Sequence, residues 1–158
     1  MSAVEERLAK MGLTLPPAVK FPNPNRTAAV LSGDLLMLSG HGFGLPNLPG
    51  VRTRGKVGSE VSELEGQATA RAIALVMLST VKEIIGDLDR VERVLRIVGL
   101  VNSAPNFERQ SVVIDGASDL FYEAFGPAVG QHARAAFGVA ELPQRFAVEI
   151  MGDFRVRV

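Results

Sequence analysis

The sequence predicts an α+β domain in which one β-sheet carries two helices on a single face. Apolar residues recur at helical spacing in two segments, residues 62–85 and about 115–125. Strand-like runs precede, separate and follow these segments, which gives the order β-β-α-β-α-β-β. With 47% hydrophobic and 22% charged residues, the chain of 158 residues has enough apolar material for one core.

The first 26 residues are expected to form a short helix and an extended arm. Val4, Leu8 and Met11 fall on one helical face, and a glycine follows them. The next stretch, PPAVKFPNPN, contains too many prolines for a helix or a central strand. We therefore assign residues 1–26 to a helix and arm, and residues 27–158 to a single domain.

The first two strands and a long loop are expected in residues 27–58. Two apolar runs flank Gly33-Asp34, a pair that suits the positive φ angles of a tight hairpin turn. The following segment, GHGFGLPNLPGVRTRGKVG, is rich in glycine and proline and has no periodicity. A compact domain usually keeps so long a loop for a purpose, so we expect it to be functional or to face a partner.

The two helices and the strand between them come next. Ser62 and Glu65 form the pattern of a capping box at the start of the first helix, and Gly86 suits its end. Residues 90–102 are dense in Val, Ile and Leu at both parities, as in a strand buried on both faces. Asp115 is positioned to cap the second helix, which we expect to end before the next Gly-Pro pair.

Two final strands, ARAAFGV (133–139) and FAVEIMGDFRVRV (146–158), complete the chain. In the last run alternate residues are apolar, and the residues between them are mostly charged. The turn at Leu142-Pro143 predicts that these two strands are adjacent and antiparallel. Since two helices cover only one face of the sheet, we expect the other face to be buried by self-association.

The overall composition excludes several classes of protein. Basic and acidic residues each total 17, and this zero net charge argues against a dedicated nucleic-acid-binding protein. The basic group Arg52, Arg54 and Lys56 is more simply explained as a solvated loop. The absence of cysteine excludes disulfides, thiolate metal sites and thiol catalysis. No signal-like or membrane-spanning run occurs, so we expect a soluble, cytoplasmic protein with no membrane partner.

The common catalytic sequence templates are absent. There is no G-x-S-x-G, P-loop or H-E-x-x-H pattern, and the inventory of His41 and His132 without cysteine predicts no metal site and no cofactor. His41 lies where a strand meets the loop, and a hydrogen bond to the backbone is a more common role there than contact with a ligand. Asn102 and Ser103 end a buried strand, where they suit a site and an ordinary turn equally.

Arg134 and Glu149 are charges placed within apolar runs. Arg134 shares its parity with Ala136 and Gly138, whose small size leaves room for a ligand beside the guanidinium. One interpretation is a buried ion pair between Arg134 and Glu149, a poor source of stability because desolvation offsets most of the attraction. The other is an arginine fork for a small carboxylate, next to a glutamate that holds and activates water. The residues alone leave both interpretations open.

Several short patterns occur in a fixed order along the chain. The combination of Ala133-Arg134, Val139-Ala140, Leu142-Pro143 and Val148-Glu149-Ile150 is similar to the C-terminal signature of the RidA/YjgF family, often labelled endoribonuclease L-PSP. MLSGHG resembles the family's strand that ends in Ser-Gly, and YEAFG resembles its second-helix Tyr-Glu-Ala-Phe. The resemblance covers about residues 27–156 and is strongest to the divergent YjgF/chorismate mutase-like branch.

This resemblance implies a fold, an assembly and an activity. The implied fold is the RidA/chorismate mutase-like mixed β-sheet with two helices packed on one face, assembled as a trimer with sites in the clefts between subunits. Characterised RidA members hydrolyse 2-imino and enamine acids to 2-keto acids and ammonia. By this resemblance Arg134 grips the substrate carboxylate, the Gly40 amide assists it, and Glu149 positions the attacking water. Asn102 and Asp119 complete the predicted substrate-binding residues.

Three positions depart from the family pattern. Ala136 stands where the family has its site cysteine, Arg26 stands at about the position of its site tyrosine, and Asp119 replaces its helix asparagine. Asp119 favours a cationic or hydroxylated ligand if it faces the cleft. We expect an enamine or imine hydrolase acting on a small carboxylate metabolite. The alternatives are a homotrimer that binds a 2-keto acid-like molecule without turnover, a ribonuclease, and a chorismate mutase-like enzyme.

Overall fold

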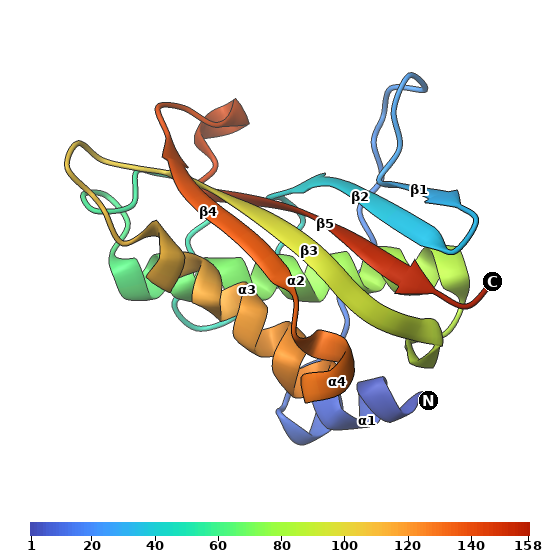
Figure 1. The fold of residues 1–158 in the computed structure, drawn as a ribbon. Coiled ribbons are helices and arrows are strands. Elements are labelled where there is room, and N and C mark those ends of the chain that lie inside the picture. The colour runs from blue at the N-terminus through green and yellow to red at the C-terminus, as the bar shows by residue number, and fades with distance from the viewer.

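A computed structural model of the protein describes residues 1–158. The chain forms one five-stranded sheet with its helices on one side (Figure 1). In chain order the elements are α1 (Ala3–Lys10), β1 (Ala29–Ser32), β2 (Leu35–His41), α2 (Glu63–Ile85), the 3₁₀ turn η1 (Leu88–Arg90), β3 (Val91–Asn102), α3 (Gln110–Phe125), α4 (Pro127–Gly130), β4 (Ala133–Val139), the 3₁₀ turn η2 (Pro143–Arg145) and β5 (Val148–Val156). The predicted α+β class and the predicted order of the main elements are confirmed.

The strand order of the sheet is β1-β2-β5-β3-β4, with β3 and β4 parallel and all other pairs antiparallel. The prediction that the last two strands are adjacent is therefore wrong, because β3 lies between β4 and β5. Helix α3 makes the crossover that a parallel β3–β4 pair needs. The connection after β4 does not reverse the chain beside that strand. It leaves the sheet through η2, whose Gln144 and Arg145 have φ angles of 52° and 59°.

Helix α2 is the centre of the hydrophobic core. Every residue from Ala72 to Val81 is buried, so the helix is enclosed on all sides, as expected for an element that is apolar around its circumference. Among its large apolar side chains only those near its ends, Leu64 and Ile84, are exposed. Helix α3 packs closely against α2 where Gly116 meets the backbone of Gln67, and a Cβ at Gly116 would overlap that carbonyl oxygen.

The ends of the helices test the capping predictions. Ser62 and Glu65 form the predicted capping box of α2, and Gly86 ends the helix with a φ angle of 83°. Helix α3 begins at Gln110 instead of near Asp115, and its N-cap residue, Arg109, makes no side-chain capping bond. The extra turn contains Val113 and Ile114, which are fully buried, so tertiary packing outweighs the weak helix preference of β-branched residues.

The sheet face opposite the helices has no cover within the chain. Helix α1 lies on the helical side, where Arg7 donates a hydrogen bond to the carbonyl oxygen of Ala124 (Figure 1). The open face carries apolar side chains that are exposed or only partly buried, among them Val30, Met37, Val98, Leu100, Phe137 and Met151. We call these six residues the open-face apolar set. Strand β3 is therefore fully buried on one face only, which corrects the prediction for a single chain.

None of the helices combines the length and the apolar character that a membrane span requires.

Candidate functional site

A cleft of about 660 Å³ lies at one end of the open face. The N-terminal arm and the η2 segment both rise above the sheet on the side away from the helices, and both contribute to the cleft walls (Figure 1). The remaining walls come from β5 and from the long loop after β2, which the sequence predicted to be functional. The lining side chains used below are Phe21, Arg26, Phe43, Arg54, Gln144, Phe146 and Glu149.

Glu149 is the only acidic side chain in the cleft lining. It lies on β5 with its side chain on the open face, half-buried, and its carboxylate takes part in no hydrogen bond or ion pair within the chain. Burial raises the pKa of Glu149 because the charged form loses hydration without gaining a compensating partner. A carboxyl group with a raised pKa keeps its proton to a higher pH than an ordinary glutamate and can both accept and return a proton in a cleft.

Gly40 lies directly beside Glu149. A Cβ at this position would be 2.8 Å from both Cδ and Oε1 of Glu149, so only glycine leaves space for the carboxylate in this orientation. The structure thus brings together two residues that the sequence predicted for one site. It also adds a steric reason for glycine, whereas the predicted role of the Gly40 amide toward a ligand stays a prediction.

Two arginines and three phenylalanines line the rest of the cleft. Phe43 makes an edge contact with Phe21 and stacks on Phe146, with centroid distances of 5.8 Å and 6.2 Å. Arg26 lies over the Phe21 ring at 5.5 Å, and Arg54 lies over the Phe146 ring at 5.6 Å. The guanidinium of Arg54 also donates hydrogen bonds to the backbone and side-chain oxygens of Gln144. The cleft therefore combines an aromatic wall with two cations.

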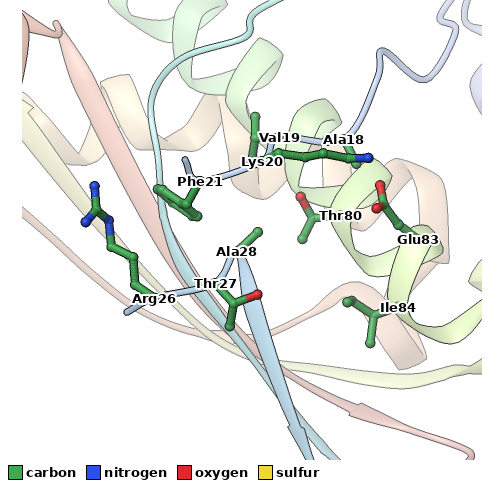
Figure 2. A pocket seen from close by; sticks show the side chains of 10 residues that line it. All are labelled: Ala18, Val19, Lys20, Phe21, Arg26, Thr27, Ala28, Thr80, Glu83 and Ile84. Atoms are coloured by element: carbon green, nitrogen blue, oxygen red, sulfur yellow. The ribbon is translucent and has the colours of Figure 1, made fainter. Parts of the chain in front are cut away.

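A smaller hollow of about 200 Å³ adjoins the cleft and shares Phe21 and Arg26 with it. Figure 2 shows this hollow between the arm and helix α2. In that view the guanidinium of Arg26 lies beyond Phe21 and points away from Thr80 and Glu83. The charge of Arg26 thus belongs to the cleft side of the arm.

Arg134 lies in a different place, on the edge strand β4. Its guanidinium donates hydrogen bonds to Asp115 at 2.6 Å and to Ser118 at 3.2 Å, both on α3. Together with Asp119 and His132 it lines a shallow pocket of about 250 Å³. The predicted binding residues Arg134 and Asp119 are thus neighbours. Asp115, which the sequence assigned to a helix cap, instead forms an ion pair with Arg134.

Arg134 and Glu149 lie on opposite faces of the sheet. Arg134 is level with Ile97, which faces the helices and is fully buried, whereas Glu149 is level with Leu100 on the open face. The two levels are three residues apart along β3. An offset of three residues along a strand turns a side chain to the opposite face and corresponds to roughly 10 Å. The first interpretation of these charges, an ion pair between them, is therefore wrong for a single chain.

The remaining predicted residues make internal contacts. His41 is buried and bonds to the Ser39 carbonyl oxygen at 2.6 Å and to the Thr80 hydroxyl at 2.9 Å, which agrees with its backbone-bonding interpretation. Burial lowers the pKa of this imidazole. Asn102 is also buried; its amide donates to the Phe146 carbonyl oxygen at 3.1 Å and accepts from the Lys56 ammonium at 2.7 Å. Its predicted contact with a ligand stays a prediction.

Sequence reasoning gave neither cleft arginine a binding role, although the family resemblance placed Arg26 at about the position of the site tyrosine. Arg54 was assigned to a solvated loop, whereas the structure places it on Phe146 in the cleft wall. Of that basic group, Arg52 pairs with Glu65 and Lys56 pairs with Glu141, whereas Arg54 forms no ion pair with a carboxylate. The usable signal was the loop itself, because an aperiodic Gly- and Pro-rich segment of this length tends to be functional. In the structure no group of three or more His, Asp or Glu side chains is placed to hold a metal ion.

The fold and the cleft define a class, a small α+β protein with a ligand-sized cleft on the uncovered face of its sheet. Residues 5–148 match the family described as "YjgF/chorismate_mutase-like, putative endoribonuclease", and the chain belongs to this family.

Related proteins support the family assignment. The chain is 45% identical to Protein TCP17 of Trypanosoma cruzi, over 93% of this chain and 90% of that protein. Among solved structures, protein Atu1372 of Agrobacterium tumefaciens, of unknown function, is 38% identical with a TM-score of 0.86, covering 98% of this chain and 93% of its own. An endoribonuclease-labelled protein of Shewanella oneidensis is 28% identical with a TM-score of 0.87, covering 97% of this chain and 99% of its own.

Proposed function

We propose that the protein is a homotrimeric hydrolase that converts an imine or enamine of a small carboxylic acid into the keto acid and ammonia. The observation that carries the proposal is the placement of Arg134 and Glu149 on opposite faces of the sheet. One chain cannot present both to a small molecule, whereas the edge strand of one copy can approach the open face of another. The site would then lie between subunits, as the resemblance to RidA proteins implies.

In this site Arg134 binds the substrate carboxylate. A guanidinium forms paired hydrogen bonds with a carboxylate. When the ligand replaces Asp115 as the partner of Arg134, the positive charge of Arg134 still faces a carboxylate. The pocket around Arg134 also contains Asp119, which is free to accept a hydrogen bond from an amino or hydroxyl group of the ligand. Ala136, which replaces the family cysteine, lies level with Gly99 on the same face of the sheet and leaves space beside the guanidinium.

Glu149 performs the proton transfers. It takes a proton from water as the water oxygen bonds to C2 of the imine and the C=N electron pair moves to nitrogen. The proton then passes to nitrogen, which gives the carbinolamine. A second transfer moves the hydroxyl proton to nitrogen through Glu149, the C–N bond breaks, and ammonia leaves with the keto acid as the other product. The raised pKa of Glu149 suits both directions of transfer.

The open-face apolar set supports self-association. Six aliphatic, thioether and aromatic side chains on a single uncovered face form the kind of surface that proteins bury against a partner. The paired charges Arg96 and Asp153, 2.9 Å apart, lie on the same face and are already neutralised within the chain. A trimer that buries this face brings the cleft to a subunit boundary.

A trimer that binds a keto acid without turnover is the second candidate. The observation that favours it is Ala136, since the position provides no thiol to take part in the reaction. Ribonuclease and chorismate mutase-like activities rest on the family label and on fold similarity, and no basic surface or reactive constellation in the cleft supports them.

The test is an assay of 2-ketobutyrate release from an imine generated in place from 2-aminobutyrate by an amino acid oxidase. We expect release above the buffer rate, with Arg134→Ala and Glu149→Ala each inactive. Mixed trimers of the two inactive variants should regain activity, because about one quarter of their sites combine an intact arginine with an intact glutamate. Binding of 2-ketobutyrate without turnover would instead identify the binding protein. Failure of the mixed trimers to recover would refute a site shared between copies.

A further inference from the structure

We propose that Arg26 and Arg54 bind a second acidic group of the ligand, so that the protein prefers dicarboxylates over monocarboxylates. The inference rests on the proposed function, in which Arg134 of a neighbouring copy holds the first carboxylate. It adds the class of substrate and two specificity-determining residues.

The first argument is charge. Arg26 and Arg54 line the same cleft, and neither forms an ion pair with a carboxylate of the chain. Other arginines of the chain do form ion pairs with acidic side chains, for example Arg52 with Glu65 and Arg145 with Glu60. The cleft thus holds two cations without a carboxylate partner and one carboxyl group, that of Glu149. An anionic ligand restores the balance.

The second argument is orientation. Each guanidinium carbon lies over a phenyl ring, that of Arg26 at 5.5 Å from the Phe21 centroid and that of Arg54 at 5.6 Å from the Phe146 centroid. Stacking orders a flexible side chain but uses none of its N–H donors, which point outward in the guanidinium plane. Arg54 donates two hydrogen bonds to Gln144, and Arg26 donates one to Asn25 at 3.3 Å. Each arginine therefore keeps enough donors for a bidentate contact with a carboxylate.

The third argument is position. Glu149 and the two arginines line one cleft, whereas Arg134 lies on the other sheet face and reaches this cleft only from another copy. A ligand held at the reacting carbon by Arg134 and Glu149 therefore extends toward Arg26 and Arg54. The three phenylalanines provide an apolar wall for the methylene groups between the two acids. A volume of about 660 Å³ accommodates more than a four-carbon acid.

Calorimetric titration of the full-length protein with 2-ketoglutarate and with 2-ketobutyrate, at one ionic strength, tests the inference. We expect the dicarboxylate to bind about tenfold more tightly. In the double variant Arg26→Met/Arg54→Met the ratio should fall to about one, because methionine keeps the length and the ring contact but has no charge. The 2-ketobutyrate affinity should change little, and the control Arg52→Met should keep the wild-type ratio.

Equal binding of the two acids by the wild-type protein would overturn the inference. So would a preference that survives in the double variant, or one that Arg52→Met abolishes to the same degree. The same measurements also distinguish a failure of this inference from a failure of the proposed hydrolase function. A dicarboxylate preference without turnover of any imine refutes the hydrolase alone, whereas turnover of monocarboxylate imines with equal affinities refutes the arginine assignment alone.

Discussion

At the scale of single residues, Glu149 is a carboxylate whose partial burial affects the stability of the fold. Its half-buried carboxylate has no partner in the chain, so the folded protein holds the proton of this group more tightly than the unfolded chain does. The contribution of Glu149 to stability is therefore complete below its ordinary pKa of 4.5 and is lost as the pH rises through its raised value. At neutral pH the charged side chain destabilises the fold.

We predict that Glu149→Gln stabilises the protein at pH 7 and has little effect at pH 4. The amide removes the buried charge at high pH, whereas at low pH the wild-type side chain is already neutral. Each kcal/mol gained corresponds to roughly 2–4 °C in Tm for a domain of this size. Thermal unfolding of both proteins from pH 4 to pH 8 checks the prediction. A variant less stable than the wild type at pH 7 would show that the charge has a stabilising partner.

Some residues of the candidate site could be predicted from the sequence and others could not. Glu149 and Gly40 were identified from the resemblance of short patterns to a family, and the structure places the Glu149 carboxylate directly over the Gly40 backbone. Arg26 and Arg54 were not. The ring contact of Arg54 joins the loop to Phe146, which is far along the chain, and the contact of Arg26 with Phe21 lies within an arm that has no periodic pattern. Exposed arginines give no periodic signal, and only tertiary contacts distinguish a stacked guanidinium from a solvated one.

At the scale of elements, the contact between α2 and α3 depends on one glycine. Gly116 on α3 lies against the backbone of Gln67 on α2, and an added methyl group would meet a carbonyl that cannot rotate away. Helices that approach this closely tolerate no extra volume at the point of contact.

We predict that Gly116→Ala destabilises the protein by about 1–3 kcal/mol, because the two helices must separate. The urea midpoint of unfolding measures the loss. Gly40→Ala is the matched control: its methyl group would meet only the mobile end of Glu149, so it should retain stability but lose activity by displacing the carboxylate. The prediction fails if Gly116→Ala unfolds at the wild-type midpoint.

Element prediction succeeded where the signal was local. The capping box at Ser62, the hairpin at Gly33 and the apolar parity of β5 all involve neighbours in sequence. The start of α3 and the pairing of β4 were missed, because burial of Val113 and Ile114 and the position of β3 between β4 and β5 arise from contacts between distant segments. A Leu-Pro turn specifies where a strand ends but not which strand lies next to it.

At the scale of the whole molecule, the open-face apolar set makes the assembly testable. Phe137 is its aromatic member, 47% exposed, and lies on β4, the strand that also carries Arg134. If three copies bury this face together, a charge at its centre opposes assembly strongly.

We predict that Phe137→Asp reduces the particle from three chains to one and abolishes turnover, since Arg134 and Glu149 of different copies no longer meet. Sedimentation measures the mass and the keto-acid assay measures the activity. Leu64→Asp is the control, since Leu64 is 75% exposed at the start of α2, away from the open face. A trimeric or fully active Phe137→Asp protein would contradict the proposed assembly.

The sequence by itself determined the fold class and the two long helices, and the resemblance of its short patterns to the RidA/YjgF family pointed to Glu149 and Gly40. These features follow from periodicity, capping and short patterns, which act over a few residues. Only the tertiary structure decided that β3 separates β4 from β5, and therefore that Arg134 and Glu149 lie on opposite faces. It also decided that two arginines stack on the aromatic wall of the cleft. The physical reason is that strand order and ring contacts depend on segments that meet only in the folded chain. Contacts of this kind leave no local pattern in the sequence.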